Sequence, residues 1–171
     1  MKKIIFSFLA LSLISLCFSM SIHAQSSQQD LDQVELMKYF TGTWQAEIGK
    51  DTTVIWELIP SDKGYKHAIY YQSKGEIYAT DRGMIGFTWE YESIICDILR
   101  PDGMLHSFFG KFVSKNKLIW ERFDTNHTIM LASIIFEFQS QDNFIEIIKW
   151  KGWKENWDEA EVTERSYTRV K

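Results

Sequence analysis

The sequence has no excess of positive charge, little cysteine and no apolar run of membrane-spanning length. Its 19 Lys and Arg residues stand against 23 Asp and Glu residues, which gives a net charge of −4. No basic surface large enough to hold phosphate backbones is expected, so nucleic acid is excluded as an expected partner. The apolar run of residues 4–16 is shorter than the roughly 20 residues needed to cross a bilayer.

The short motifs of several enzyme classes are also missing. The sequence contains no Gly-x-Ser-x-Gly elbow, no Cys-x-x-Cys pair and no phosphate-binding loop. Nothing assigns a nucleophile or a general base, so no catalytic residue and no cofactor are predicted. An enzyme is therefore the least favoured class of function for this chain.

The N-terminal residues have the pattern of an export signal. Lys2 and Lys3 form a short positive region, an apolar region follows, and Ala24 ends an A-x-A-like cleavage site. Cleavage there would leave 147 residues with a net charge of −6 and Cys96 as the only cysteine, so no intrachain disulfide is expected. We predict a bacterial signal peptide over 1–24 and a periplasmic or secreted protein, with an uncleaved membrane anchor as the alternative.

The remaining chain is predicted to form a short helix followed by a single β domain. Leu31, Val34 and Met37 recur at helical spacing within 26–40, behind Ser26, Ser27 and Asp30 as possible caps. We therefore assign 25–41 to an N-terminal segment with this helix and 42–171 to one domain, a size at which single hydrophobic cores commonly close.

Eleven short runs rich in aromatic and β-branched residues follow, separated by polar turns at roughly ten-residue intervals. The runs are Gly42–Ile48, Thr53–Ile59, Tyr65–Gln72, Glu76–Thr80, Met84–Tyr91, Ser93–Leu99, Met104–Val113, Leu118–Phe123, Ile129–Gln139, Phe144–Trp150 and Glu161–Val170. Two short neighbours are expected to be one bent strand, although Asp81–Gly83 also has the composition of a turn. Short turns favour antiparallel neighbours, and a long meander abolishes its edges by closing. The sequence predicts an all-β, antiparallel up-and-down β-barrel of about ten strands.

Alternation of residue types along these runs indicates which side chains face the interior. The inward rows are aromatic and aliphatic with occasional polar groups, a composition typical of small-molecule pockets. The predicted ligand-lining residues are Trp56, His67, Ile69, Tyr71, Phe87, His106, Phe108, Trp120, Arg165 and Tyr167. Trp89 and Arg122 also fall on inward rows. The alternative is a solid core of the same rings, and because a histidine on an apolar face is more often a core residue than a ligand, no metal site is predicted.

The segment Phe40-Thr-Gly-Thr-Trp44, a Gly-x-Trp after a short helix, resembles the opening of the lipocalin-like calycin barrels. It is similar in particular to uncharacterised bacterial lipocalin-like domains of the DUF1579 type. Those domains also have a final turn with Gly and Trp, here Lys151-Gly-Trp153 with Trp157, and a last strand ending in Tyr-x-Arg, here Tyr167-Thr-Arg169. The resemblance implies an exported barrel that binds a small apolar or amphipathic molecule inside.

Two further groups of related barrels make specific suggestions. Nitrobindin-like barrels hold haem through a histidine in their C-terminal part, and no histidine follows His127, so haem is not expected. Fatty-acid-binding barrels clamp a carboxylate with an Arg-x-Tyr on the last strand. The resemblance implies this role for Arg165 and Tyr167, whereas residue chemistry alone leaves open an internal acid such as Glu146 as the partner of Arg165.

The two ends of the predicted barrel are expected to meet. With an even number of strands, the first and last run antiparallel, which places Trp44 beside Arg169. A guanidinium stacked on an indole gains roughly 0.5–2 kcal/mol and would plug this end, so we assign both residues a structural role.

Two functional hypotheses from different classes follow. The first is a barrel that binds a small hydrophobic or amphipathic ligand in its interior. The second is a module with a filled core, whose exposed Trp153 and Trp157 contact a protein or a glycan. An interior void of several hundred Å³ would favour the first, and dense packing throughout would favour the second.

Export is predicted to remove residues 1–24. N-terminal sequencing of the protein recovered from outside the cytoplasm should begin at Gln25. A sequence that begins at Met1 would show instead that the segment is retained.

Overall fold

The computed structural model describes residues 31–123, 129–152 and 154–170. All the described residues belong to one compact unit, Leu31–Lys171. The predicted signal peptide lies outside the described residues.

This unit opens with α2 (Gln33–Met37), which continues into a 3₁₀ turn, η1 (Lys38–Phe40). The helix is capped by Asp32, whose carboxylate accepts a hydrogen bond from the backbone N–H of Glu35 at 3.0 Å. The predicted caps Ser26, Ser27 and Asp30 lie outside the described residues, so the sequence pattern missed the residue that the structure shows as the cap.

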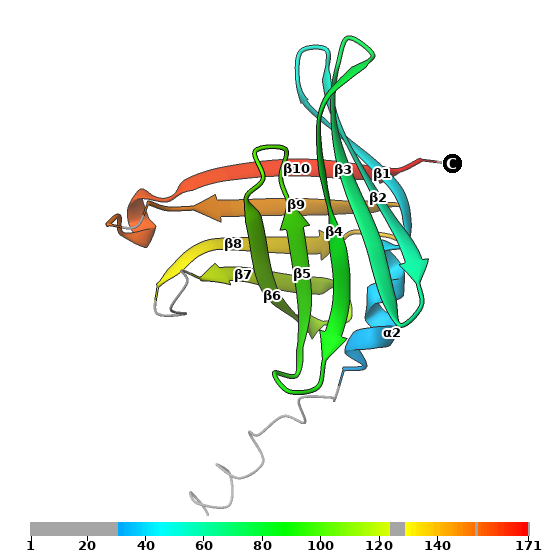
Figure 1. The fold of residues 1–171 in the computed structure, drawn as a ribbon, viewed down its shortest axis with the longest axis vertical. Helices are drawn as coiled ribbons and strands as arrows, with labels where there is room; N and C mark the ends of the chain where they lie inside the picture. The colour runs from blue at the N-terminus through cyan, green and yellow to red at the C-terminus, as the bar shows by residue number, and fades with distance from the viewer. Residues whose placement is uncertain (1–30, 124–128, 153, 171) are drawn as a thin grey trace, which may run out of the picture. The chain divides into compact units, whose positions relative to one another are not determined.

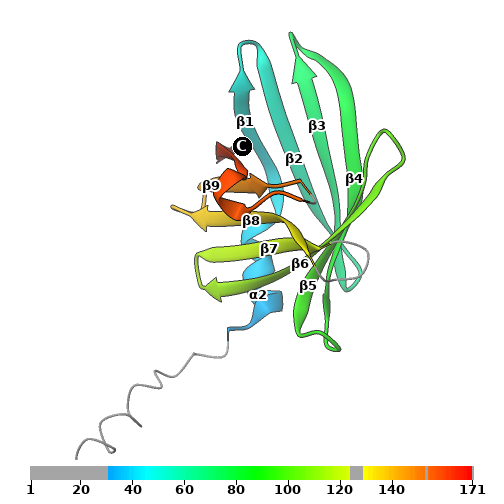
Figure 2. The same cartoon turned by 90° about the vertical axis from the view of Figure 1, so that its left-hand side faces the viewer.

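Ten antiparallel strands then close into a barrel, which confirms the predicted fold class (Figures 1 and 2). The strands are β1 (Gly42–Gly49), β2 (Thr52–Ser61), β3 (Gly64–Ser73), β4 (Glu76–Thr88), β5 (Ser93–Leu99), β6 (Leu105–Ser114), β7 (Lys117–Phe123), β8 (Met130–Phe138), β9 (Asn143–Trp150) and β10 (Glu161–Arg169). Each strand pairs with its neighbour in the chain, and β1 pairs with β10. A short 3₁₀ turn, η2 (Trp157–Glu159), precedes the last strand.

Strand β4 corrects two sequence predictions. Glu76–Thr80 and the run that begins at Met84 form one strand, as expected for two of the short runs, but the predicted turn at Asp81–Gly83 is wrong because these residues continue the ladders to β3 and β5. The Asp81 side chain is buried, so its turn-like composition reflects a polar group in the interior. Alternation predicts an inward position for Trp89, yet this residue lies in the turn after β4 and is 81% exposed.

One end of the barrel, which we call the plugged end, is filled by aromatic rings. Phe40 enters it from η1, is fully buried, and lies 4.6 Å from Phe138 and 5.2 Å from Phe136 between ring centroids. Trp44 and Phe144 pack at 4.8 Å in the same cluster. Edge-to-face contacts of this kind favour aromatic pairs beyond the area that they bury.

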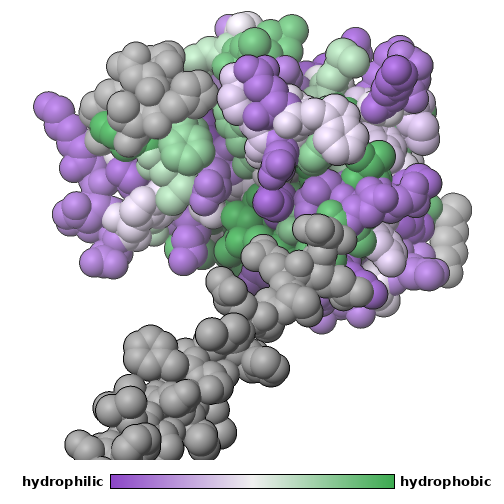
Figure 3. Space-filling model, turned by 90° about the horizontal axis from the view of Figure 1, so that it is seen from below, coloured by the Kyte–Doolittle hydropathy of each residue, from purple (hydrophilic) through white to green (hydrophobic). Residues whose placement is uncertain are grey.

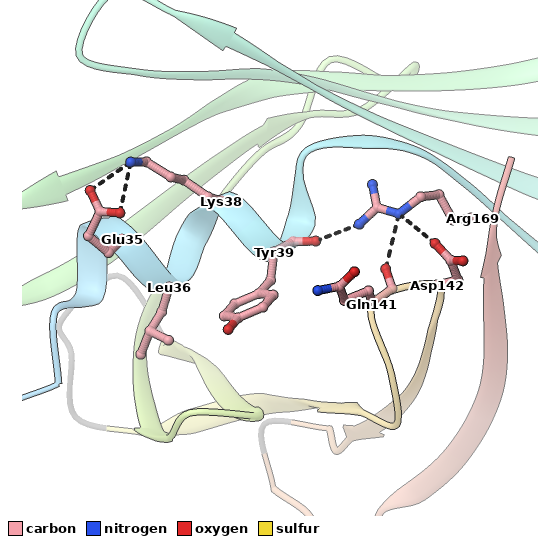
Figure 4. A pocket seen from close by; sticks show the side chains of 7 residues that line it. All are labelled: Glu35, Leu36, Lys38, Tyr39, Gln141, Asp142 and Arg169. Atoms are coloured by element: carbon pink, nitrogen blue, oxygen red, sulfur yellow. Dashed lines mark hydrogen bonds and ion pairs between the residues drawn. The ribbon is translucent and has the colours of Figure 1, made fainter. Parts of the chain in front are cut away.

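The first and last strands meet at the plugged end through Arg169. Its guanidinium lies 4.0 Å from the ring centroid of Trp44, its partner across the β1–β10 ladder, so the expected contact is present. The guanidinium also donates to the backbone carbonyl of Thr41. It donates further to the carbonyls of Tyr39 (3.0 Å) and Gln141 (3.1 Å), as Figure 4 shows. Gly42, at φ +115°, leaves room for it, since a Cβ there would lie 2.7 Å from Nη1. Arg169 thus joins the first strand, the helix and the last hairpin.

The β1–β10 ladder is short. It pairs Trp44 with Arg169 and Gln45 with Thr168, and beyond them the hydrogen bond from Val170 N–H to the Thr43 carbonyl extends it at the plugged end. The β9–β10 ladder, by contrast, runs over eight residue pairs from Glu161 to Thr168. Towards the open end the two edges separate, and the β1–β2 and β3–β4 hairpins project from the barrel at the top of Figure 1.

The indole of Trp120 occupies the space in which a side chain at Gly110 on β6 would lie. The two residues are partners in the β6–β7 ladder, and a methyl group on Gly110 would overlap the five-membered ring of Trp120. Gly86 on β4 offers a contrast, since a methyl group there would meet nothing within 4 Å.

We predict that Gly110→Ala lowers the free energy of unfolding by about 2–3 kcal/mol, because the buried indole must shift within a packed core. Gly86→Ala is the matched control and should change it by less than about 0.5 kcal/mol. Urea unfolding of both variants checks this, and equal effects would contradict the packing of Trp120 on Gly110.

Candidate functional site

A cavity of about 470 Å³ lies at the end opposite the aromatic plug, which we call the open end. Its apolar floor comes from several strands, and polar and aromatic groups form its upper wall and rim. The floor residues are Ile69, Ile98, Phe108, Ile134 and Ile148. The remaining lining residues are Tyr71, Tyr78, Ala79, Asp81, Arg100, Pro101, His106, Trp150 and Arg165.

The cavity follows from the size of the barrel and the sizes of its inward residues. An eight-stranded barrel is just narrow enough to be filled by side chains, and this barrel has ten strands. Near the plug, Phe136 and Phe144 fill the extra width. Nearer the open end, the inward residues of the same two strands are Ile134 on β8 and Ile148 on β9. Their side chains are smaller than the aromatic rings and leave the space unfilled.

A buried charge cluster lies on β9 and β10 beside the cavity. Glu146 accepts hydrogen bonds from the Arg165 guanidinium and the Tyr167 hydroxyl, each at 3.4 Å. The side chains of Arg165 and Glu146 keep 21% and 11% of their exposure. Burial raises the pKa of Glu146, while Arg165 and Tyr167 oppose that rise by stabilising the carboxylate. The internal acid that the sequence left open is therefore present.

A second polar pair lies across the cavity on β3 and β4. The Tyr71 hydroxyl donates to the Asp81 carboxylate at 3.3 Å. Burial, with the charge of Asp81, raises the pKa of Tyr71 to about 12, so the phenol stays protonated at neutral pH. The unused lone pairs of Asp81 leave the site able to accept a hydrogen bond from a ligand.

The predicted lining residues separate into two groups. Ile69, Tyr71, His106, Phe108 and Arg165 do line the cavity. The others lie elsewhere, in the core or near the barrel wall. They are Trp56, His67, Phe87, Trp120 and Tyr167.

The second group packs against other side chains and not against the cavity. The sequence predicts that Trp56 and Trp120 contact an apolar ligand, yet they lie in the aromatic core with ring centroids 6.3 Å apart. Tyr167 stacks on Phe144 at 4.7 Å, and Phe87 packs against Trp89 at 4.9 Å. Alternation gives the face on which a residue lies but not its level along the barrel axis, which is why the sequence does not separate these positions.

His67 is held inside the wall between β3 and β5. Its Nε2 lies 3.3 Å from the carbonyl oxygen of Asp97 and 3.7 Å from the sulfur of Cys96. Burial lowers the pKa of His67 and raises the pKa of the Cys96 thiol well above its usual range. The pair is therefore neutral, and the thiol is a small buried group rather than a nucleophile.

Sequence reasoning missed several lining residues. Asp81 has the sequence context of a turn, and Tyr78 lies at the bulge where the β3–β4 register shifts. The position of Trp150 could have been predicted, because it lies on the same inward-facing row of residues as Ile148. Arg100 belongs to the predicted hairpin turn, and nothing in the sequence places that turn over a cavity.

A second hollow of about 450 Å³ lies on the outside of the plugged end, between α2 and the β8–β9 turn (Figure 4). Its charged groups are already paired, Lys38 with Glu35 at 2.7 Å and Arg169 with Asp142 at 3.4 Å. We therefore interpret it as a product of the contacts that close the barrel.

The fold and the cavity define a closed antiparallel β-barrel with one plugged end and one open end. No model of a known protein family matches the chain, and no curated protein matches it either. The relation to lipocalin-like and DUF1579-type barrels stays a prediction. Within the described residues, no group of three or more His, Cys, Asp or Glu side chains is placed to hold a metal ion, and no helix has the length and apolar content to span a bilayer.

The Glu146–Arg165 pair is predicted to be strongly coupled. Glu146→Leu or Arg165→Leu alone should lower the free energy of unfolding by about 2–4 kcal/mol, because each leaves a mostly buried charge unpaired. The double variant should cost less than the sum of the two. Lys117 and Glu137, 2.7 Å apart with about a third of each side chain exposed, provide a control pair whose coupling should stay below about 1 kcal/mol. Additive losses at Glu146 and Arg165 in urea unfolding would contradict the pairing.

Proposed function

We propose that this protein is an exported barrel that binds a small amphipathic molecule in the cavity at its open end. One observation carries the proposal: a cavity of about 470 Å³ with an apolar floor and a few polar groups on its walls. Volumes of roughly 300–1,000 Å³ and linings of this kind are typical of ligand sites. The charged and apolar pattern of residues 1–24 supports the export.

The composition of the lining supports an amphipathic rather than a purely apolar ligand. Ile69, Phe108 and Ile134 offer surface to a hydrocarbon part. Asp81 and Tyr71 offer hydrogen bonds to a polar part. Arg165 lies at the wall, but Glu146 already neutralises it, which argues against the simple Arg-x-Tyr carboxylate clamp.

The alternative function is a module that contacts a protein or a glycan. Of the two tryptophans proposed for it, Trp157 is half-buried beneath the Lys151 ammonium, 5.7 Å from its ring, and Trp153 lies outside the described residues. Trp89 and Tyr91, in the turn after β4, are 81% and 61% exposed and are better placed for such a contact. Hydrophobic residues also gather near the middle of the face in Figure 3, among hydrophilic ones.

Binding can be tested with N-phenyl-1-naphthylamine, a neutral fluorophore whose emission rises in apolar surroundings. We predict saturable binding to the wild-type chain and a loss of affinity of at least about tenfold in Ile148→Trp, whose indole would occupy the cavity. Ile147→Trp, one residue earlier and on the outer face, should stay within about twofold.

Two results would contradict the proposal. One is the absence of saturable probe binding by the folded wild-type protein. The other is equal binding by the two tryptophan variants, which would place the probe on the surface. If the wild-type protein does bind the probe in the cavity, native mass spectrometry of protein purified from its own host would identify the molecule that occupies it.

A further inference from the structure

Three basic side chains lie close together at one side of the cavity, Arg100 and His106 in its lining and Arg122 next to them. His106 on β6 and Arg100 in the β5–β6 turn both line the cavity. Glu121 on β7 is the ladder partner of Phe109 on β6, so the next residue, Arg122, lies beside Phe108. Phe108 and His106 are two residues apart on the same face of β6. The row of Arg122 continues from the buried Leu118 and Trp120, which places it on the inner face of the barrel.

The charges of this group are incompletely compensated. Arg100 has a long contact of 3.8 Å with Asp102, and nearly half of each side chain is exposed, so this pair contributes little. Among the described residues, no carboxylate lies within ion-pair distance of Arg122. Burial first, and then the charge of Arg100, lowers the pKa of Arg122, so the two guanidinium groups are close enough for each to disfavour the charge of the other.

The basic residue in the wall formed by β10 differs from this group, because it has a counter-ion. There Arg165 has its own counter-ion, Glu146, on the neighbouring strand. A cationic group kept half-buried beside a cavity without such a partner is unfavourable unless an anion from outside completes it. Guanidinium groups bind carboxylate and phosphate oxygens through paired, charge-assisted hydrogen bonds.

We infer that Arg100, His106 and Arg122 form an anion-binding subsite at one side of the cavity, and that the ligand is an amphipathic acid. This inference rests on the proposed function. The acidic head group contacts the three basic side chains, and the hydrocarbon part lies beside them on the apolar lining residues Ile98, Phe108 and Ile134. Carboxylates and phosphate esters share the required chemistry.

His106 makes binding at this subsite depend on pH. Burial and the charges of Arg122 and Arg100 lower its pKa, and Asp102 and Asp81 oppose them only in part, so the imidazole is neutral at pH 7 in the free protein. A bound anion stabilises the protonated imidazole and raises that pKa. Binding therefore takes up a proton, and the affinity for an anion increases as the pH falls through the range in which His106 titrates.

The inference can be tested by displacing N-phenyl-1-naphthylamine from the full chain with four ligands that have the same ten-carbon tail. These are decanoate, decyl phosphate, decanol and decylammonium. We expect one or both of the anions to bind on the order of tenfold more tightly than decanol, and decylammonium more weakly than decanol. Decanoate and decyl phosphate together show which acidic head group the subsite prefers.

Two variants and a control assign the effect to the cluster. Arg122→Gln should reduce the preference for an anion over decanol by about fivefold or more. Arg82→Gln removes an exposed cation from the outer face of β4 and should leave the preference intact. His106→Gln should abolish the gain in decanoate affinity of roughly threefold expected between pH 8 and pH 6.

The outcomes separate this inference from the proposed function. If decanol and the anions bind equally, or if Arg122→Gln leaves their ratio unchanged, the anion subsite is refuted while the cavity remains a ligand site. If the probe itself does not bind, the proposed function fails first. A preference for decylammonium would refute the anion-binding subsite, because it would show that the cavity favours a cation, and it would point to Asp81 as the group that binds it.

Discussion

The contact between Arg169 and Trp44 lies at the β1–β10 pairing, where the first and last of the described strands meet. Every other ladder links strands that are consecutive in the sequence. The ladder between β1 and β10 has two residue pairs. A ladder this short leaves most of the closure to side chains. The guanidinium lies on the indole and donates to carbonyls of the helix, of the segment before β1 and of the β8–β9 turn. The side chain of Arg169 therefore reinforces the few backbone contacts that join the two edges and covers the aromatic plug.

The division of the interior into a filled half and a hollow half follows from this closure. Phe40 reaches the core because the segment that carries it is tied to Arg169 through Tyr39 and Thr41. The rings around Phe40 then pack a barrel that is too wide for aliphatic residues alone. Beyond their reach the same strands carry isoleucines, and the cavity begins. Stability and ligand space are thus assigned to opposite ends, so residues at the open end are free to be charged or polar.

Much of the fold could be predicted from the sequence, and less of the site. Alternation and turn residues identified the strands because each covers one buried face, and the even number of strands predicted that Trp44 and Arg169 would meet. The prediction of a turn at Asp81–Gly83 was wrong because a polar residue inside a barrel has the same composition as a turn. Whether a residue lines the cavity depends on its position along the barrel axis. The alternation of residue types gives the face of the strand on which a residue lies but not this position. Phe136 and Ile134 face inward on the same strand one alternation step apart, yet Phe136 belongs to the aromatic core and Ile134 lines the cavity.

The short β1–β10 ladder has a consequence for the behaviour of the protein at high concentration. Towards the open end, β10 presents backbone N–H and C=O groups on the side that β1 leaves, and such an edge invites a strand from another molecule to add to the sheet. Glu161 and Glu164 are exposed along this stretch and Glu47 on the facing strand, so an incoming copy of the same edge would meet like charges. These carboxylates disfavour self-association through this edge, because like charges opposite each other across two paired strands are destabilising.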